Sequence, residues 1–352
     1  MRNPHFCSIS NEVEQYGNTQ IKEYLVNEGV DENHIIEIAF DSFENRKYRD
    51  PEVLFPYLMG KIADKEMYYV LLDEVHMYPL TYSEFMSVYD GDKYEGWRDY
   101  VLFGGIPLVL GFETADQKSD FLKSLFEETY ISDITGRNNI RNKAELEELL
   151  NILSSAIGSL TNPSKLSATF KSVKNKNISK DTIIKYIDYL KDSFLIDSAI
   201  RYDIKGKKYI NTPSKYYFTD LGLRNARLNF RQVEETHAME NIIFNELKVR
   251  GYNVDVGVVV MNEVDKNGKK IRKQLEVDFV CNKGSKRFYI QSAYALPDKE
   301  KMEQEQRSLV NTGDGFKKII ITKDAVVPLY NEEGILVMSV YDFLLNPDSM
   351  EI

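Results

Sequence analysis

The sequence predicts an α/β protein built from several successive parts. Residues 21–74 and 235–322 each alternate helical and β-type hydrophobic patterns, which is typical of sheets covered by helices. Between them, residues 164–216 hold 12 Lys and Arg against 5 Asp and Glu, a net charge of +7, whereas the whole chain of 352 residues carries −10. Since −10 minus +7 is −17, the remainder is acidic. We expect an incomplete α/β core at residues 1–80, a helical segment at 81–140, a helix-and-hairpin part at 141–230 and a second α/β domain at 231–352.

The composition indicates a globular protein of a reducing compartment. Cys7 and Cys281 lie far apart in the sequence and match no metal-ligand or redox spacing. The longest apolar stretch, residues 100–112, is interrupted by glycine and proline and is shorter than the ~20 residues that a membrane span needs. We therefore expect a cytoplasmic protein with no membrane partner.

The first part reads as helix, strand, helix and strand. Helical spacing from Ile21 ends near Glu28, where Gly29 follows as a stop signal. A β-branched run at residues 34–40 predicts a strand, a proline-initiated helix covers residues 51–63, and residues 68–72 give the next strand. This order predicts a parallel sheet, which normally has more than two strands.

An acidic pair, Asp73 and Glu74, ends the second of these strands. In P-loop ATPases such a strand carries an Asp that holds magnesium through water and a Glu that orients the attacking water. The accompanying phosphate loop needs Gly-x-x-x-x-Gly-Lys followed by Ser or Thr, and no segment of the sequence has this pattern. Gly60-Lys61 comes closest, but Ile62 follows it and the predicted helix contains it.

These segments resemble a known family. Residues 21–74, 78–85, 104–107 and 122–140 are similar to the AAA-like P-loop ATPases of bacteria and archaea that carry a C-terminal domain of unknown function. The resemblance covers almost the whole chain from Ile21 onward. It implies a partial P-loop NTPase-type sheet, with ATP and Mg as cofactors if the family activity is retained. Because the phosphate loop is missing, the chain resembles a truncated or degenerate member that needs no cofactor.

The basic middle part predicts a winged helix-turn-helix. Helical patterns at residues 145–160, 164–173 and 179–194 precede two hairpin arms, residues 198–204 and 208–218. In such a module the third helix enters the major groove of double-stranded DNA and the wing touches phosphates. The expected DNA contacts are Lys180, Lys185, Lys191, Lys205, Lys207 and Lys208. The alternative is a solvated basic face on a module that binds an unidentified protein.

The last part resembles the core of PD-(D/E)xK nucleases. A helix at residues 235–249 precedes three strands, a helix after Pro297 and a strand at 317–322. The resemblance implies magnesium ligands at Glu240, Asp278 and Gln291. The reactive Lys expected two residues after Gln291 is replaced by Ala293, and a displaced Lys286 or Lys299 is the alternative source of that function.

Together these features predict a degenerate ATPase-family protein. We expect a DNA- or protein-binding module without ATP hydrolysis, in which Asp73 and Glu74 are remnants of an ATPase site and Glu240, Asp278 and Gln291 are remnants of a nuclease site. Two enzymatic alternatives remain at this point. One is an ATPase whose phosphate loop comes from another chain, and the other is a metal-dependent nuclease with a displaced lysine.

Overall fold

A computed structural model of the chain describes most of its residues. The described residues are 18–27, 29–39, 45, 47–48, 51–64, 67–73, 79–174, 178–231, 233–264, 268 and 270–352. The chain divides into two compact units, Met1–Met77 and Tyr78–Ile352, which are treated separately below. Within the described ranges, the structure contains no helix with the length and apolar character of a membrane span.

The first unit has the predicted order of helices and strands. Its elements are α1 (Asn18–Asn27), the short 3-10 helix η1 (Glu32–His34), β1 (Ile35–Ala39), α2 (Pro51–Lys61) and β2 (Tyr69–Asp73). β1 and β2 pair in parallel, from Ile35 opposite Tyr69 to Ala39 opposite Asp73. Ile36, Ile38 and Leu58 form the centre of its small core. The predicted parallel pairing is therefore confirmed.

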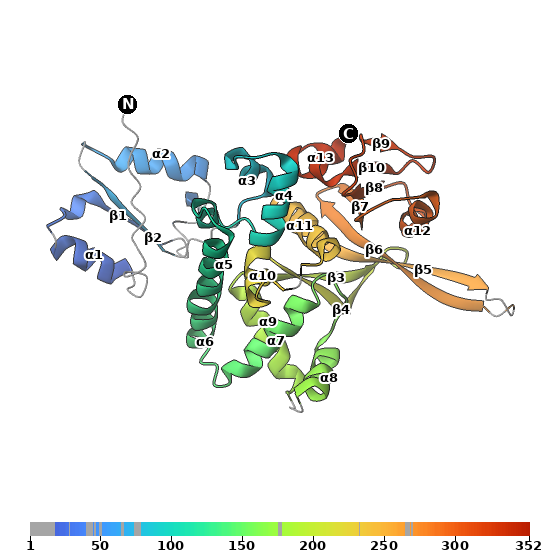
Figure 1. Cartoon of the computed structure of the whole chain (residues 1–352), viewed down its shortest axis with the longest axis horizontal. Coiled ribbons are helices and arrows are strands. Elements are labelled where there is room, and N and C mark those ends of the chain that lie inside the picture. The colour runs from blue at the N-terminus through green and yellow to red at the C-terminus, as the bar shows by residue number, and fades with distance from the viewer. Residues whose placement is uncertain are drawn as a thin grey trace. The chain divides into compact units, whose positions relative to one another are not determined.

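The second unit opens with a run of helices (Figure 1). They are α3 (Tyr82–Val88), α4 (Lys93–Phe103), the 3-10 helix η3 (Pro107–Gly111), α5 (Ala115–Ser124), the π-helical turn η4 (Leu125–Ile131), α6 (Ser132–Arg137), α7 (Lys143–Ser155), α8 (Pro163–Lys174) and α9 (Lys180–Asp192). We predicted a helix over residues 145–160, but α7 ends at Ser155. Gly158 adopts a left-handed backbone with φ of 68°, which helical residues do not adopt.

Eight strands of the described residues form one mixed sheet in this unit. They are β3 (Ile196–Asp203), β4 (Lys208–Phe218), β5 (Asn253–Val264), β6 (Lys270–Lys283), β7 (Lys286–Ala293), β8 (Lys317–Thr322), β9 (Leu329–Tyr330) and β10 (Leu336–Ser339), in the spatial order β4-β3-β5-β6-β7-β8-β10-β9. Their connections include α10 (Leu221–Arg227), α11 (Glu235–Val249) and α12 (Lys299–Val310). α13 (Val340–Leu345) and the 3-10 helix η5 (Ser349–Glu351) follow β10. The β3–β4 hairpin thus belongs to the same sheet as the strands that follow it.

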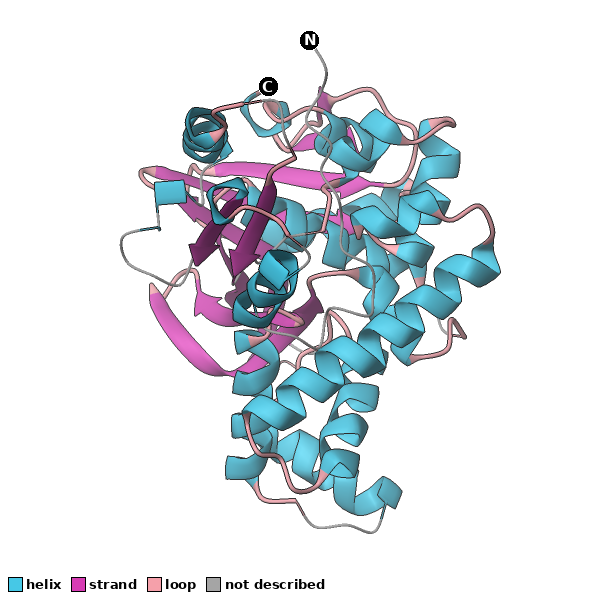
Figure 2. Ribbon diagram, turned by 90° about the vertical axis from the view of Figure 1, so that its left-hand side faces the viewer, coloured by secondary structure: helices cyan, strands magenta, loops and turns pink. Residues whose placement is uncertain are grey.

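Helices pack against both faces of this sheet (Figure 2). One face carries Phe279 and Ile290, which join the large core together with Ile243 and Phe244 of α11. The opposite face carries Val280 and other residues of a second core, which includes Leu309 of α12. The face that meets α11 is called the α11 face below, and the other is called the α12 face.

The glycine pair at residues 104–105 has a structural role. Asp220, fully buried at the start of α10, accepts a hydrogen bond from the backbone N–H of Gly105 at 2.8 Å and from that of Leu223 at 2.9 Å. A Cβ atom on Gly105 would lie 2.3 Å from the backbone oxygen of Leu80, and Gly104 has a φ of 75°. Burial raises the pKa of Asp220 to about 6. Gly105 therefore permits a close backbone contact with Leu80, and Gly104 leaves room for the carboxylate of Asp220.

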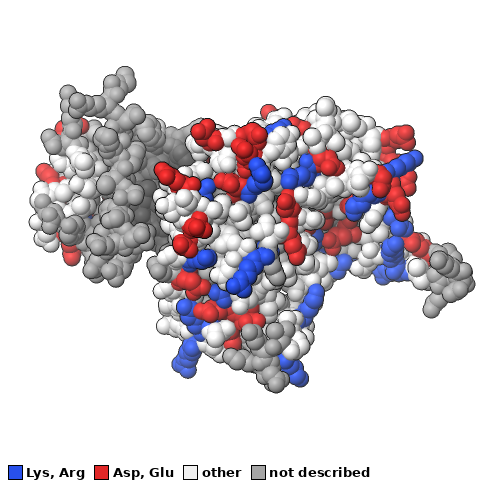
Figure 3. Space-filling view, in the orientation of Figure 1, with Lys and Arg blue, Asp and Glu red and all other residues white. Residues whose placement is uncertain are grey.

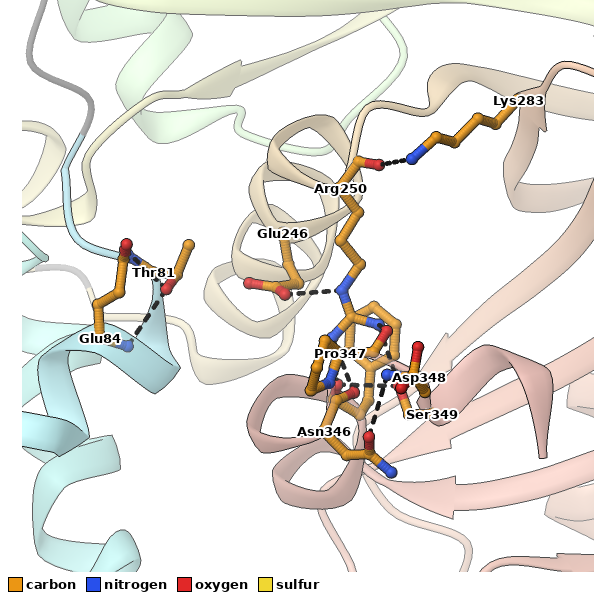
Figure 4. A network of polar contacts seen from close by, with 10 residues as sticks. Thr81, Glu84, Glu246, Arg250, Lys283, Asn346, Pro347, Asp348 and Ser349 are labelled. Atoms are coloured by element: carbon orange, nitrogen blue, oxygen red, sulfur yellow. Dashed lines mark hydrogen bonds and ion pairs between the residues drawn. The ribbon is translucent and has the colours of Figure 1, made fainter. Parts of the chain in front are cut away.

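Arg250 fastens the C-terminal segment to α11 (Figure 4). Its Nε lies 2.7 Å from Oε1 of Glu246, and its Nη1 donates to the Ser349 hydroxyl at 3.0 Å. The same guanidinium donates to the backbone oxygens of Phe343, in the last turn of α13, and of Asn346, which follows that helix. Five N–H donors in one plane suit this multiple capture of carbonyl oxygens.

Candidate functional site

Lys215 of β4 lies among three carboxylates on the α11 face of the sheet. Its Nζ is 2.8 Å from Oε1 of Glu240 on α11 and 2.8 Å from Oε1 of Glu276 on β6. It is 3.3 Å from Oδ1 of Asp278, also on β6. The Lys215 side chain is 4% exposed, those of Glu240 and Asp278 are each 10% exposed, and that of Glu276 is 36% exposed. We call these four residues the Lys215 cluster.

The position of Glu240 is fixed by contacts between α11 and β4. The side-chain amide of Asn241 bonds both backbone groups of Phe218, donating to its oxygen at 2.7 Å and accepting from its N–H at 2.8 Å. Tyr217 stacks on Phe244 with ring centroids 4.2 Å apart and donates its hydroxyl to Oε1 of Glu240 at 2.7 Å. Because residues two apart on a strand face the same side, Lys215 and Tyr217 approach Glu240 together.

A β-bulge places Asp278 beside Lys215. Asp255 pairs with Val280 and Gly257 with Val277, so one residue of β5 lies opposite two residues of β6, Asp278 and Phe279. Val277 and Val280 both belong to the second core, so the two bulge residues between them, Asp278 and Phe279, lie together on the α11 face. The second carboxylate oxygen of Asp278 accepts the backbone N–H of Ser292 at 2.9 Å.

The electrostatics of the Lys215 cluster hold its ammonium in the charged form. The three neighbouring carboxylates raise the pKa of Lys215 against the opposing effect of burial. Burial and the charge of Asp278 raise the pKa of Glu240, and Lys215 lowers it, so that the net effect is a pKa of about 7. Three carboxylates and one ammonium have a formal charge of −2 when all are ionised. Protonation of Glu240 near neutral pH relieves part of that excess.

Gln291 lies away from this cluster, contrary to the position that the nuclease resemblance implied. Its side-chain oxygen accepts a hydrogen bond from the Ser308 hydroxyl of α12 at 3.3 Å. Tyr289 and Ala293 belong to the second core, so strand alternation places Gln291 on the α12 face with them. The structure thus brings Glu240 and Asp278 together but leaves Gln291 on the other face.

Neither lysine considered as a displaced reactive group reaches the cluster. Lys286 pairs with Glu351 at 2.6 Å, and Lys299 is 86% exposed and lies 3.9 Å from Glu303. The lysine that does lie among the carboxylates, Lys215, was missed by the sequence reasoning. It is 25 residues from Glu240 and 63 from Asp278 in the chain, so no motif spacing connects them.

The cluster does not fit a resident divalent metal ion in this arrangement. Carboxylate oxygens are suitable ligands for Mg²⁺, but here the Lys215 ammonium hydrogen-bonds to the oxygens that would coordinate it. Across the described ranges, the structure gathers no set of three His, Cys, Asp or Glu side chains in metal-binding positions. Lys215 supplies the positive charge that a metal would otherwise provide.

The predicted ATPase remnants lie in the first unit. Asp73 is the last residue of β2, with its backbone opposite Ala39. Glu74 lies outside the described residues. Gly60 and Lys61 are the last residues of α2, so this Gly-Lys pair is not at a strand-to-helix turn.

The predicted DNA-contact lysines lie on α9 and at the turn between β3 and β4. Lys180 and Lys185 are exposed on α9, and Lys191 near its end is half-buried. Lys205, Lys207 and Lys208 are exposed at the hairpin turn. The carboxylate of Asp203 accepts the backbone N–H of Gly206 at 2.8 Å, which closes this turn.

Comparisons with known proteins find relatives of unknown function. The model of a domain of unknown function (DUF8612) matches residues 94–234. An uncharacterized protein of Haemophilus influenzae is 28% identical over 384 aligned residues, covering 93% of this chain and 90% of that protein. An uncharacterized protein of Methanocaldococcus jannaschii is 27% identical over 245 residues, and the match spans 70% of this chain and 52% of that protein.

A solved structure also shows a partial likeness. The crystal structure of protein VC1899 from Vibrio cholerae matches with a TM-score of 0.24 and 13% sequence identity, covering 68% of this chain and 56% of that one.

Proposed function

We propose that this chain binds double-stranded DNA through residues 143–218, acting as a winged helix, and that it neither hydrolyses ATP nor cleaves DNA. The order α7, α8, α9, β3 and β4 is that of three helices followed by a hairpin. We call the hairpin of β3 and β4, with its turn at residues 204–207, the wing. One observation carries the proposal. Lys205, Lys207 and Lys208 are exposed together at the hairpin turn, and within the described residues none of them is paired with a carboxylate.

The wing carries more net charge than the third helix of this module. The exposed and half-buried side chains of α9 include three lysines, Lys180, Lys185 and Lys191, and three aspartates, Asp181, Asp188 and Asp192. These six charges cancel, whereas the three exposed lysines of the turn face the buried carboxylate of Asp203, which is bonded to the backbone of Gly206. Since phosphate contacts supply most of the sequence-independent affinity for DNA, we expect the wing to dominate binding.

Metal-dependent cleavage is a second candidate because Glu240, Glu276 and Asp278 meet at one place. A bound divalent cation would polarise a phosphate and lower the pKa of water. We favour binding without cleavage because the Lys215 ammonium already hydrogen-bonds to the carboxylate oxygens that would coordinate a metal, and Ala293 carries no reactive group. In this proposal, the Lys215 cluster stabilises the fold and holds no resident metal.

ATP hydrolysis is disfavoured by the sequence of the first unit. Triphosphate affinity comes mainly from a glycine-rich loop at a helix N-terminus, and no segment of the sequence has the Gly-x-x-x-x-Gly-Lys pattern of such a loop followed by Ser or Thr. Calorimetric titration of the purified protein with ATP and Mg²⁺ should give no binding heat. A saturable heat would favour the alternative in which ATP binds and another chain completes the site.

The DNA-binding proposal is tested with the full chain, because β3 pairs with β5 and the module is not structurally separate. We would measure fluorescence anisotropy of a labelled 30-base-pair duplex between about 25 and 200 mM salt. The wing variant, Lys205→Glu with Lys207→Glu, should bind at least about tenfold more weakly and with a shallower salt dependence. The control, Lys286→Glu with Lys299→Glu, makes the same charge change elsewhere and should bind as the unmodified protein does. No affinity of the unmodified protein at the lowest salt would overturn the proposal.

A further inference from the structure

The β5–β6 hairpin is longer than the sheet that contains it. β3 pairs with β5 only at residues 256–258, and β7 pairs with β6 only at residues 279–283. Residues 260–264 and 270–274 pair with each other and have no further neighbouring strand among the described residues. We call these two segments the outer ribbon, and Figure 1 shows the hairpin projecting from the sheet.

The outer ribbon has little of its surface buried by the rest of the protein. Met261 packs against the second core at the base, and Glu263 pairs with Arg307 of α12 at 2.5 Å. The side chains of Asn262, Ile271, Arg272, Lys273 and Gln274 are exposed. Each strand of the outer ribbon is four residue steps long, or about 14 Å. A two-stranded ribbon is marginally stable by itself in water, so this one has stability to gain from a partner.

The charge of the outer ribbon favours a polyanionic partner. Its two segments, residues 260–264 and 270–274, contain three Lys and Arg against one Glu, a net of +2 in a chain that carries −10. That one acid, Glu263, is already paired with Arg307 of α12. Arg272 and Lys273 form no ion pair with any described carboxylate. Figure 3 shows Lys and Arg side chains near the base of the hairpin.

One face of the outer ribbon continues toward the wing. Arg272, Gln274 and Glu276 alternate along β6, so they share one face of the strand. Arg201 of β3 donates from Nη2 to Oε1 of Gln274 at 2.9 Å. β3 leads directly into the turn that carries Lys205 and Lys207. The two hairpins are therefore joined by a side-chain contact and carry the same sign of charge.

We propose that the outer ribbon is a second contact for double-stranded DNA, in which Arg272 and Lys273 bind backbone phosphates while the wing binds a neighbouring stretch. This inference rests on the DNA binding proposed above. A two-stranded ribbon fits the major groove of B-DNA, and Arg272 and Lys273, as successive residues of a strand, point to opposite sides of the ribbon. The phosphate backbones of the groove border the two edges of such a ribbon, and the long side chains of Arg272 and Lys273 extend toward them from its two faces.

The test compares variants of the outer ribbon with the wing variant in the same anisotropy titration. The ribbon variant, Arg272→Glu with Lys273→Glu, should lower the affinity for the 30-base-pair duplex by roughly tenfold and reduce the salt slope by about 1 to 2. The milder ribbon variant, Arg272→Gln with Lys273→Gln, should lie between it and the unmodified protein. The control with Lys286→Glu and Lys299→Glu should leave both quantities unchanged. Thermal melting of every variant checks that the fold is retained.

The outcomes separate this inference from the function on which it rests. If the unmodified protein and the ribbon variants bind equally while the wing variant is weakened, the ribbon contact is overturned and DNA binding stands. If the unmodified protein does not bind, both are overturned. If the ribbon variants change the sedimentation of the protein without changing DNA affinity, the ribbon contacts a second copy of the chain, which also overturns the inference.

Discussion

Replacing Lys215 with methionine should destabilise the second unit strongly. The substitution keeps the length of the side chain but removes the ammonium that lies 2.8 Å from Glu240, 2.8 Å from Glu276 and 3.3 Å from Asp278. Glu240 and Asp278 are each only 10% exposed, so they would remain buried without a counter-charge. Removing one partner of a buried ion pair costs about 3–5 kcal/mol, and we expect a loss of that size at pH 7.

Urea unfolding followed by tryptophan fluorescence measures this loss. Trp97 is the single tryptophan, is 1% exposed, and lies in the second unit, so its emission reports on that unit. A matched control is Lys299→Met, because Lys299 is 86% exposed and its ion pair with Glu303 is 3.9 Å long. An exposed pair of this kind contributes well under ~1 kcal/mol, so the control should unfold at nearly the unmodified midpoint.

The cost of Lys215→Met should also depend on pH. The pKa of Glu240 is already raised to about 7 by burial, and loss of the lysine raises it further. Lowering the pH from 8 to 5 therefore protonates Glu240 in the variant and reduces the destabilisation. Adding Glu240→Gln to Lys215→Met should recover part of the loss at pH 8. A loss below about 1 kcal/mol at pH 8, equal to that of the exposed control, would refute the assignment of Lys215 as the counter-ion of this cluster.

Three further predictions concern the Lys215 cluster, Asp220 and Gly105. Mn²⁺ should raise the melting temperature of Lys215→Met, whose carboxylates lack a cation, but not that of the unmodified protein; an equal shift in both would contradict this. The folded-state pKa of Asp220 is raised from 3.8 to about 6, so its contribution to stability falls by about 2 kcal/mol as the pH rises from 4 to 6. Asp220→Asn should therefore weaken the pH dependence of the free energy of unfolding across that window. Gly105→Ala should cost over about 2 kcal/mol in urea unfolding, because its Cβ would lie 2.3 Å from the backbone oxygen of Leu80, whereas Gly111→Ala meets nothing within 4 Å and should cost little; similar midpoints for the two would argue against the close contact.

The local patterns of the sequence predicted many of the helices and strands. The bounds of α11, Glu235–Val249, equal those predicted, where Gly251 served as the stop signal. The parallel pair of the first unit was predicted from the alternation of helices and strands. These features depend on neighbouring residues, which is why periodicity and capping reveal them. The short strands β9 and β10 and helix α13 have weak local signals and were not predicted.

The candidate site was less predictable because it depends on tertiary structure. Glu240 and Asp278 were identified by resemblance, but the partner that holds them together, Lys215, comes from β4, and two other strands separate β4 from the strand of Asp278 in the sheet. The bulge opposite Val256 puts Asp278 and Phe279 on the same face of the sheet, and no sequence pattern indicated it. Gln291 matched the expected spacing, yet it lies on the face of β7 that α12 covers, where it bonds to Ser308. That choice of face depends on how the helices pack and not on the local sequence.

Binding without cleavage is tested most directly by one plasmid experiment. Supercoiled plasmid is incubated with the purified full chain and either Mg²⁺ or Mn²⁺, and each sample is divided before electrophoresis. One half is run directly and the other after protease digestion. We predict slower migration in the first half and intact supercoiled plasmid in the second. Nicked circles that appear with the unmodified protein and disappear with Asp278→Ala would contradict this account, as would unchanged migration in the undigested half.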